Sequence, residues 1–160
     1  MQKVTILCVG KLKEKFYMEA AAEYSKRLSR FCRLEIIELP EDRLPENPSA
    51  GQIENALAKE AAAISAKLPS SAFVVAMCVE GKLLSSEDLS AMMASAASGG
   101  DSHVVFVIGG SFGLHESVKK SAQFRLSMSP MTFPHHLARV MLLEQIYRAY
   151  QIYAGSRYHK

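Results

Sequence analysis

The stretch VVFVIGGSFG at residues 104–113 joins a fully apolar run to a glycine-rich turn. A run that is apolar on both faces is typical of a central parallel strand, and Phe73–Val79 has the same character. Longer amphipathic segments with helical spacing separate such runs. Strands that alternate with helices predict an α/β fold, in which helices sandwich a parallel-type sheet.

The same alternation extends along the whole chain. The expected strands are Val4–Val9, Leu34–Leu39, Phe73–Val79, Val104–Ile108 and Arg125–Met128, with Leu34–Leu39 nearest an edge because it alternates most. The expected helices are Phe16–Phe31, Gln52–Leu68, a helix from Ser85 to about Ala97 that Gly99-Gly100 ends, His115–Ala122 and His136–Ala154. The proline-punctuated loop Pro40–Pro48 is too short to separate two domains. A single domain over residues 1–160 is therefore expected.

The composition excludes several classes of protein. Of 160 residues, 49% are hydrophobic and 22% charged, which is ordinary for a globular protein and excludes disorder. The net charge of 19 − 16 = +3 is too small to indicate nucleic-acid binding by itself. Cys8, Cys32 and Cys78 form no CxxC pair, so they are expected as reduced core thiols. Neither a signal peptide nor a run of membrane-spanning length is present, so a cytoplasmic protein without membrane association is expected.

The glycine turn at Gly109–Gly113 is the first candidate binding site. Ligands of parallel sheets bind at the carboxyl ends of the strands, which directs attention to the loops after Val79, Ile108 and Met128. Glycines let backbone N–H groups approach a ligand closely. The turn lacks the GxGxxG pattern of dinucleotide sites. A turn that serves only tight strand-to-helix packing is the structural alternative.

The same five residues satisfy G-x-S-x-G, the pattern of a serine hydrolase with Ser111 as nucleophile. The partners of such a nucleophile are poor here. No Asp follows Ser111 in the chain, which leaves Glu116 or Glu144 as the acid. The candidate bases would be His135, His136 or His159. Because adjacent helix positions cannot face one metal, His135 and His136 predict no metal site.

The expected last helix is apolar on more than one side. Such a helix is buried on several sides, so it threads the core, packs against a second subunit, or does both. Its tyrosines and arginines are suited either to stacking on nucleic acid or to core and interface packing.

Three linked C-terminal segments carry a resemblance to a known family. They are residues 104–113, the run SMSPMTFPH at residues 127–135, and the helix of Ala138-Arg139-Val140 and residues 144–149. Together with Val9–Lys13 and Tyr158–Lys160, they resemble the RlmH ribosomal RNA methyltransferases over essentially the whole chain.

The resemblance implies a SPOUT-class α/β fold whose C-terminal region forms a deep trefoil knot. It also implies a homodimer that binds S-adenosylmethionine and methylates N3 of a pseudouridine in 23S ribosomal RNA, within the assembled ribosome. The residues it assigns to the cofactor are Met77, Gly109, Met128, Ser129, Pro130, Met131, Thr132 and Phe133. Met77, Met131 and Phe133 would form an apolar wall.

The chemistry of that reaction suggests further residues. The N3 proton must leave and the resulting anion must be stabilised. Arg139 is expected to face the uracil oxygens or a phosphate, with an ion pair to Glu144 as the structural alternative. His135 and His159 are candidates for proton transfer. Tyr158 and His159 in the tail Arg157–Lys160 are expected at the substrate, although composition alone would leave this tail frayed. A non-catalytic knotted ribosome-binding or RNA-binding factor is the competing non-enzyme class.

Overall fold

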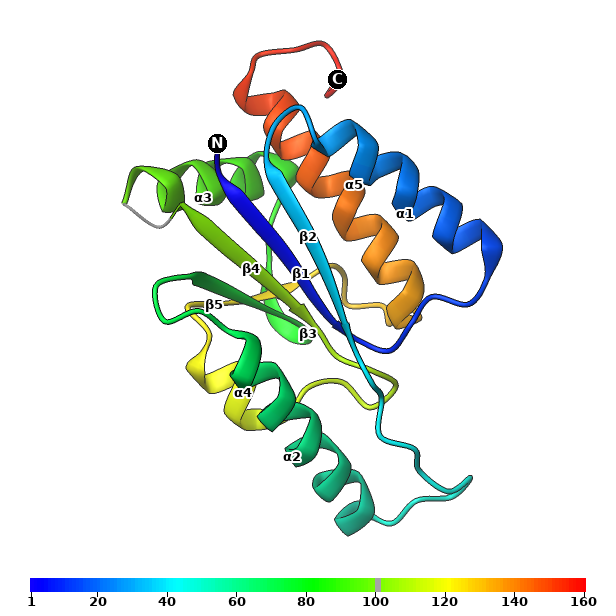
Figure 1. The fold of residues 1–160 in the computed structure, drawn as a ribbon. Helices are drawn as coiled ribbons and strands as arrows, with labels where there is room; N and C mark the ends of the chain where they lie inside the picture. The colour runs from blue at the N-terminus through cyan, green and yellow to red at the C-terminus, as the bar shows by residue number, and fades with distance from the viewer. Residues whose placement is uncertain (100–101) are drawn as a thin grey trace.

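A five-stranded parallel sheet organises the computed structural model, which describes residues 1–99 and 102–160 (Figure 1). The strands are β1 (Lys3–Val9), β2 (Arg33–Leu39), β3 (Phe73–Leu83), β4 (His103–Ile108) and β5 (Phe124–Ser127). They pair in the order β2-β1-β4-β3-β5, and every neighbouring pair is parallel. The predicted α/β class is confirmed, with β2 at an edge and with β3 and β4 inside the sheet.

Helices cover both faces of this sheet. They are α1 (Lys15–Leu28), α2 (Ala50–Lys67), α3 (Ser86–Ser98), α4 (Glu116–Ser121) and α5 (His135–Tyr153). One core cluster joins α1, α3 and α5 to Ile6, Val75 and Phe106, and the other joins α2 and α4 to Leu7 and Val107. Successive strand residues point to opposite faces, so each inner strand supplies both cores. Figure 1 shows α5 lying along α1 on the first face.

The predicted helix ends differ from the observed ones at the start of α2 and at the end of α1. Helix α2 begins two residues before the expected Gln52 because Ser49 and Gln52 form a capping box. Ser49 Oγ accepts a hydrogen bond from Gln52 N at 3.1 Å, and Gln52 Oε1 accepts one from Ser49 N at 2.8 Å. Helix α1 ends at Leu28, whose carbonyl accepts from Phe31 N in a tight turn. The expected capping box of Ser85 and Asp88 is confirmed at α3. Gly99 caps the C-terminus of α3, and Gly100 lies outside the described residues.

The cysteines are free thiols, as predicted. Burial raises the pKa of Cys8 and of Cys32 to about 11, so both stay protonated at neutral pH. Cys78 is only half-buried, however, and it is not a core residue. It follows the buried part of β3, at the carboxyl end of the sheet where Cys78 and Met77 line a cavity.

Candidate functional site

A cavity of about 790 Å³ lies beside residues 77–80 of β3, just after the pairing of β3 with β4 ends, and where the chain leaves β4 and β5. This is the edge of the sheet at which parallel strands present a ligand site. The cofactor residues assigned by resemblance that line it are Met77, Gly109, Met128, Ser129, Met131, Thr132 and Phe133. Pro130 is exposed and lies outside this lining.

The apolar side chains of the cavity are not equally buried. Met77, Met128 and Phe133 are half-buried, whereas Met131 is 73% exposed. Met131 therefore lies at the rim, where it can contact a ligand only from the solvent side. The half-buried residues can exclude water from part of the cavity.

The glycine turn forms one side of the cavity, and its glycines are required by the backbone. Gly109 and Gly110 are buried, Gly110 and Gly113 form an isolated bridge, and Gly113 has a φ of +79°. A Cβ atom on Gly109 would overlap the carbonyl of Gly113. Glycine at position 109 is therefore required by close packing within the turn itself, and residues 111–113 of the same turn line the cavity.

The structure argues against the serine hydrolase. A nucleophile elbow is a strained turn, yet in residues 1–99 and 102–160 no residue other than glycine has a positive φ. The candidate acids are engaged elsewhere, because Glu144 pairs with Arg148 and Glu116 with Lys119. Ser111 uses its backbone N–H to contact Glu41, at 2.8 Å from Oε1.

Arg139 is placed differently from either expectation. Its side chain is 2% exposed, and Nη1 donates to Glu38 Oε2 at 2.6 Å while Nη2 donates to the Gly10 carbonyl at 2.9 Å. The expected structural ion pair with Glu144 is wrong, since the partner is Glu38 on β2. Burial disfavours the Glu38 carboxylate, but the Arg139 guanidinium and Leu12 N–H more than compensate and lower its pKa.

His135 begins α5 and lines the cavity, as expected of a residue near the ligand. Burial and the neighbouring His136 lower its pKa, so its imidazole is neutral at neutral pH. Within the part of the chain that the structure describes, its buried Nε2 has no hydrogen-bond partner. Glu41 Oε2 is the nearest acidic atom, at 4.0 Å. Because Nε2 is enclosed, a proton from a ligand in the cavity would have to go to Nδ1 of this neutral imidazole.

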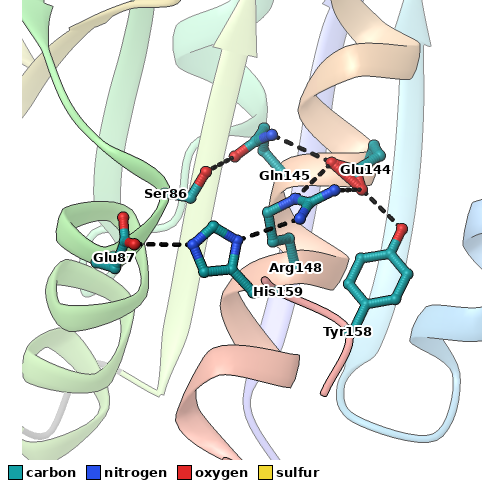
Figure 2. Close-up of polar contacts among 7 residues, drawn as sticks. All are labelled: Ser86, Glu87, Glu144, Gln145, Arg148, Tyr158 and His159. Carbon is teal, nitrogen blue, oxygen red and sulfur yellow. Dashed lines mark hydrogen bonds and ion pairs between the residues drawn. The ribbon is translucent and has the colours of Figure 1, made fainter. Parts of the chain in front are cut away.

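The C-terminal tail folds back onto α5 instead of fraying (Figure 2). Tyr158 Oη donates to Glu144 Oε2 at 2.9 Å, and its ring lies under the Arg148 guanidinium at 4.9 Å. Arg148 Nη1 donates to His159 Nδ1 at 3.1 Å, which leaves Nε2–H to donate to Glu87 Oε1 at 2.7 Å. Tyr158 and His159 thus lie together, but neither lines the cavity of its own chain.

Several residues of this tail cluster were not expected from the sequence. Gln145 Oε1 accepts from Ser86 Oγ at 2.6 Å, which links α5 to the start of α3 beside Glu87 (Figure 2). The spacing of Glu144 and Arg148, four residues apart on one helix, is a signal that could have indicated their ion pair. Ser86 and Glu87 carry no comparable local signal.

Residues 1–99 and 102–160 contain no group of three or more side chains arranged to bind a metal ion. No helix among these residues is long and apolar enough to span a membrane.

Comparison with known proteins defines the class to which the fold and the cavity belong. Residues 2–159 match the family model described as "Predicted SPOUT methyltransferase", and the chain belongs to this family. More particularly, it is 49% identical over 158 residues to "Ribosomal RNA large subunit methyltransferase H" of Bifidobacterium adolescentis, and the match covers 99% of each chain. The resemblance to that group, stated from the sequence, is confirmed.

The fold has a distant structural relative as well. A solved structure titled "The structure of a probable methylase family protein from Haemophilus influenzae Rd KW20" matches with a TM-score of 0.52 at 12% identity. The match covers 98% of this chain and 70% of the other. At this identity the likeness concerns the fold alone.

The cavity residues fit S-adenosylmethionine in size and in chemistry. A volume of about 790 Å³ is within the usual range for a site that encloses a cofactor. Apolar side chains suit the adenine ring and the methyl-bearing sulfur, and the glycine turn, Ser129 and Thr132 bring polar groups to the lining. The cofactor bears no phosphate, so it needs no phosphate-binding loop.

Proposed function

We propose that this chain is an S-adenosylmethionine-dependent methyltransferase that methylates N3 of a pseudouridine in 23S ribosomal RNA of the assembled ribosome. The observation that carries the proposal is the cavity at the ends of β3, β4 and β5, lined by residues that the family resemblance assigns to the cofactor. The 49% identity to a ribosomal RNA large subunit methyltransferase over nearly the whole chain supports the substrate.

The bound cofactor would supply an electrophilic methyl group. The residues of this chain then have three tasks. The glycine turn and residues 128–133 would bind and orient the ligand, and Met77, Met128 and Phe133 would exclude water. His135, neutral and at the cavity, is the better placed histidine to accept the N3 proton within one chain.

Arg139 is assigned a positioning role in this proposal. Its guanidinium is buried against Glu38 and Gly10, so it fixes the start of α5, and with it His135, against β1 and β2. Tyr158 and His159 are assigned to the substrate. Because they lie away from their own chain's cavity, they would serve the cavity of a second subunit, in a homodimer.

The remaining parts of the proposal concern the setting of the reaction. The chain is one SPOUT domain over residues 1–160 with the family's trefoil knot, and it works in the cytoplasm. A net charge of +3 per subunit is modest for tight binding to free RNA, so affinity should depend on a shaped ribosomal surface. Lys11, Lys13 and Lys15 are exposed and would contribute phosphate contacts.

Two measurements test this function. Calorimetry should detect S-adenosylmethionine binding, and mass spectrometry should detect one methyl group added to the large-subunit ribosomal RNA of ribosomes from cells that lack this gene. Whole ribosomes should react and a protein-free RNA hairpin should not. Ribosome binding without methyl transfer would instead support the non-catalytic factor, and covalent labelling of Ser111 by a fluorophosphonate would support the hydrolase.

A further inference from the structure

Glu41 lies on the loop that follows β2 and contacts the glycine turn. Its Oε1 accepts a hydrogen bond from Ser111 N at 2.8 Å, across 70 residues of sequence. Its Oε2 lies 4.0 Å from Nε2 of His135, at the start of α5. One carboxylate therefore contacts two of the segments that line the cavity, although Glu41 itself does not line it.

The glycine turn is shaped around this carboxylate. A Cβ atom on Gly110 would lie 2.6 Å from Glu41 Oε1 and 2.9 Å from Cδ. Glycine at position 110 thus permits the close approach of the carboxylate, which is a role distinct from that of Gly109. Gly10, at the end of β1, has Glu41 Oε2 and His135 Nε2 within 4 Å of its own ideal Cβ position.

The loop that carries Glu41 is itself held in place. The neighbouring Asp42 donates its backbone N–H to Glu60 Oε2 at 3.0 Å. Glu60 lies on α2 and is buried. The loop therefore has a fixed attachment to α2 on one side of Glu41 and to β2 on the other, so Glu41 can transmit that rigidity to the glycine turn.

From these contacts we propose that Glu41 is a positioning residue for the cofactor cavity, which fixes the glycine turn at Ser111 relative to the start of α5 at His135. The cofactor part of this inference rests on the proposed function. Glu41 acts through the backbone and side chains that line the cavity, and it does not line the cavity itself. Its hydrogen-bonding oxygen, and not its charge, is the feature required.

Three variants separate this role from a general effect on folding. Glu41→Ala removes the acceptor, whereas Glu41→Gln keeps an oxygen that can accept from Ser111 N. Glu46→Ala is the matched control, because Glu46 is an exposed carboxylate on the same loop. All three variants should retain the parent's thermal unfolding midpoint to within a few degrees.

The first readout needs no ligand. Hydrogen exchange at the Ser111 amide, followed by NMR, should become about tenfold faster in Glu41→Ala and should stay near the parent rate in Glu41→Gln and Glu46→Ala. The second readout is S-adenosylmethionine affinity by calorimetry. Glu41→Ala should bind about tenfold more weakly, equivalent to about 1.4 kcal/mol. In a methylation assay it should raise KM for the cofactor more than it lowers kcat.

The outcomes distinguish the two proposals. Parent-like exchange and parent-like affinity in Glu41→Ala would overturn the positioning role, as would equal losses in Glu41→Ala and Glu41→Gln. If the parent protein binds no S-adenosylmethionine, the proposed function fails. The exchange measurement would then still decide whether Glu41 holds the turn.

Discussion

The two halves of α5 each carry an arginine paired with a glutamate, and the two pairs differ in the burial of the arginine and in the location of its partners. Arg139 is 2% exposed and contacts Glu38 on β2 and the carbonyl of Gly10, which directly follows β1. The Arg148 side chain is 25% exposed and contacts Glu144 on its own helix and His159 in the tail. The first pair joins a helix to the sheet. The second lies within α5, and its two members contact His159 and Tyr158 of the terminal segment (Figure 2).

This difference separates a structural ion pair from a candidate functional one. Loss of the buried Arg139 guanidinium leaves a space in the core and Glu38 without its cation, whereas water can partly replace Arg148, whose side chain is 25% exposed. The Arg139 end of α5 should therefore control stability, and the tail end should control activity. The burial of Arg139 indicates a positioning role in place of the substrate contact expected from the sequence.

The largest expected effect is that of Arg139→Ala on stability. The change removes the partner of Glu38 and leaves a space among buried residues, so we expect the free energy of unfolding to fall by about 3–5 kcal/mol. Urea denaturation at one fixed protein concentration measures it, since association would make stability depend on concentration.

Two further variants sharpen this first prediction. Arg139→Met retains the apolar stem, so it leaves a smaller space among the buried residues. It should therefore destabilise less than Arg139→Ala. Arg148→Ala, on the same helix, is the matched control. If Arg139→Ala unfolds no more easily than Arg148→Ala, the contrast between the two ends of α5 is wrong.

How far the sequence could predict these features depends on the distance between the partners in the chain. The sheet was predictable because residues 73–79 of β3 and residues 104–108 of β4 are apolar on both faces, which is typical of an inner parallel strand. The cavity was predictable because three strand ends meet at one edge. The Ser49–Gln52 capping box is also a local sequence signal, and it places the start of α2 at Ala50 instead of the expected Gln52.

The pairings that organise the site could not be predicted in the same way. Arg139 and Glu38 are 101 residues apart, and Glu41 and Ser111 are 70 apart. No acidic residue lies three or four positions from Arg139, so the local sequence indicates no partner for it, unlike Arg148. Only the packing of α5 against β1 and β2 buries one guanidinium and leaves the other accessible.

The second prediction concerns removal of Tyr158–Lys160. The contacts of this segment are partly exposed, so folding and S-adenosylmethionine affinity should stay near those of the full chain. Methyl transfer to ribosomes should fall by about a hundredfold or more, because the Tyr158 ring and the His159 imidazole would be lost from the substrate side. A radiolabel transfer assay measures it. Near-complete activity of the truncated protein would give the tail a purely structural role.

The third prediction tests how the tail is held. Arg148→Ala removes the cation over the Tyr158 ring and the donor to His159 Nδ1, while Glu144 can still accept from Tyr158 Oη. The free energy of unfolding should fall by only about 1 kcal/mol or less. Limited proteolysis should cleave the tail faster than in the parent. An unchanged cleavage rate would show that Tyr158 and His159 dock without Arg148.

The smallest expected effect is a pH dependence at the other end of α5. Burial, reinforced by His136, lowers the pKa of His135 in the folded protein, so between that value and the unfolded value of about 6.5 only the unfolded chain binds the proton. The stabilisation that neutral His135 contributes to the folded state is complete above about pH 6.5 and decreases as the pH drops below that value. His135→Asn should therefore show a shallower loss of stability than the parent between pH 6.5 and 5.

The comparison of variant with parent is needed because burial also lowers the pKa of His103, which contributes a loss of the same sign. That contribution is common to both proteins and cancels in the difference. The Glu38 pKa is lowered too, but its contribution is lost only below the unfolded value of about 4.3, outside this window. Parallel stability profiles for His135→Asn and the parent, measured by urea denaturation from pH 7.5 to 5, would mean that His135 is as hydrated as in the unfolded chain. His135 would then lose its place as the neutral base on the cavity.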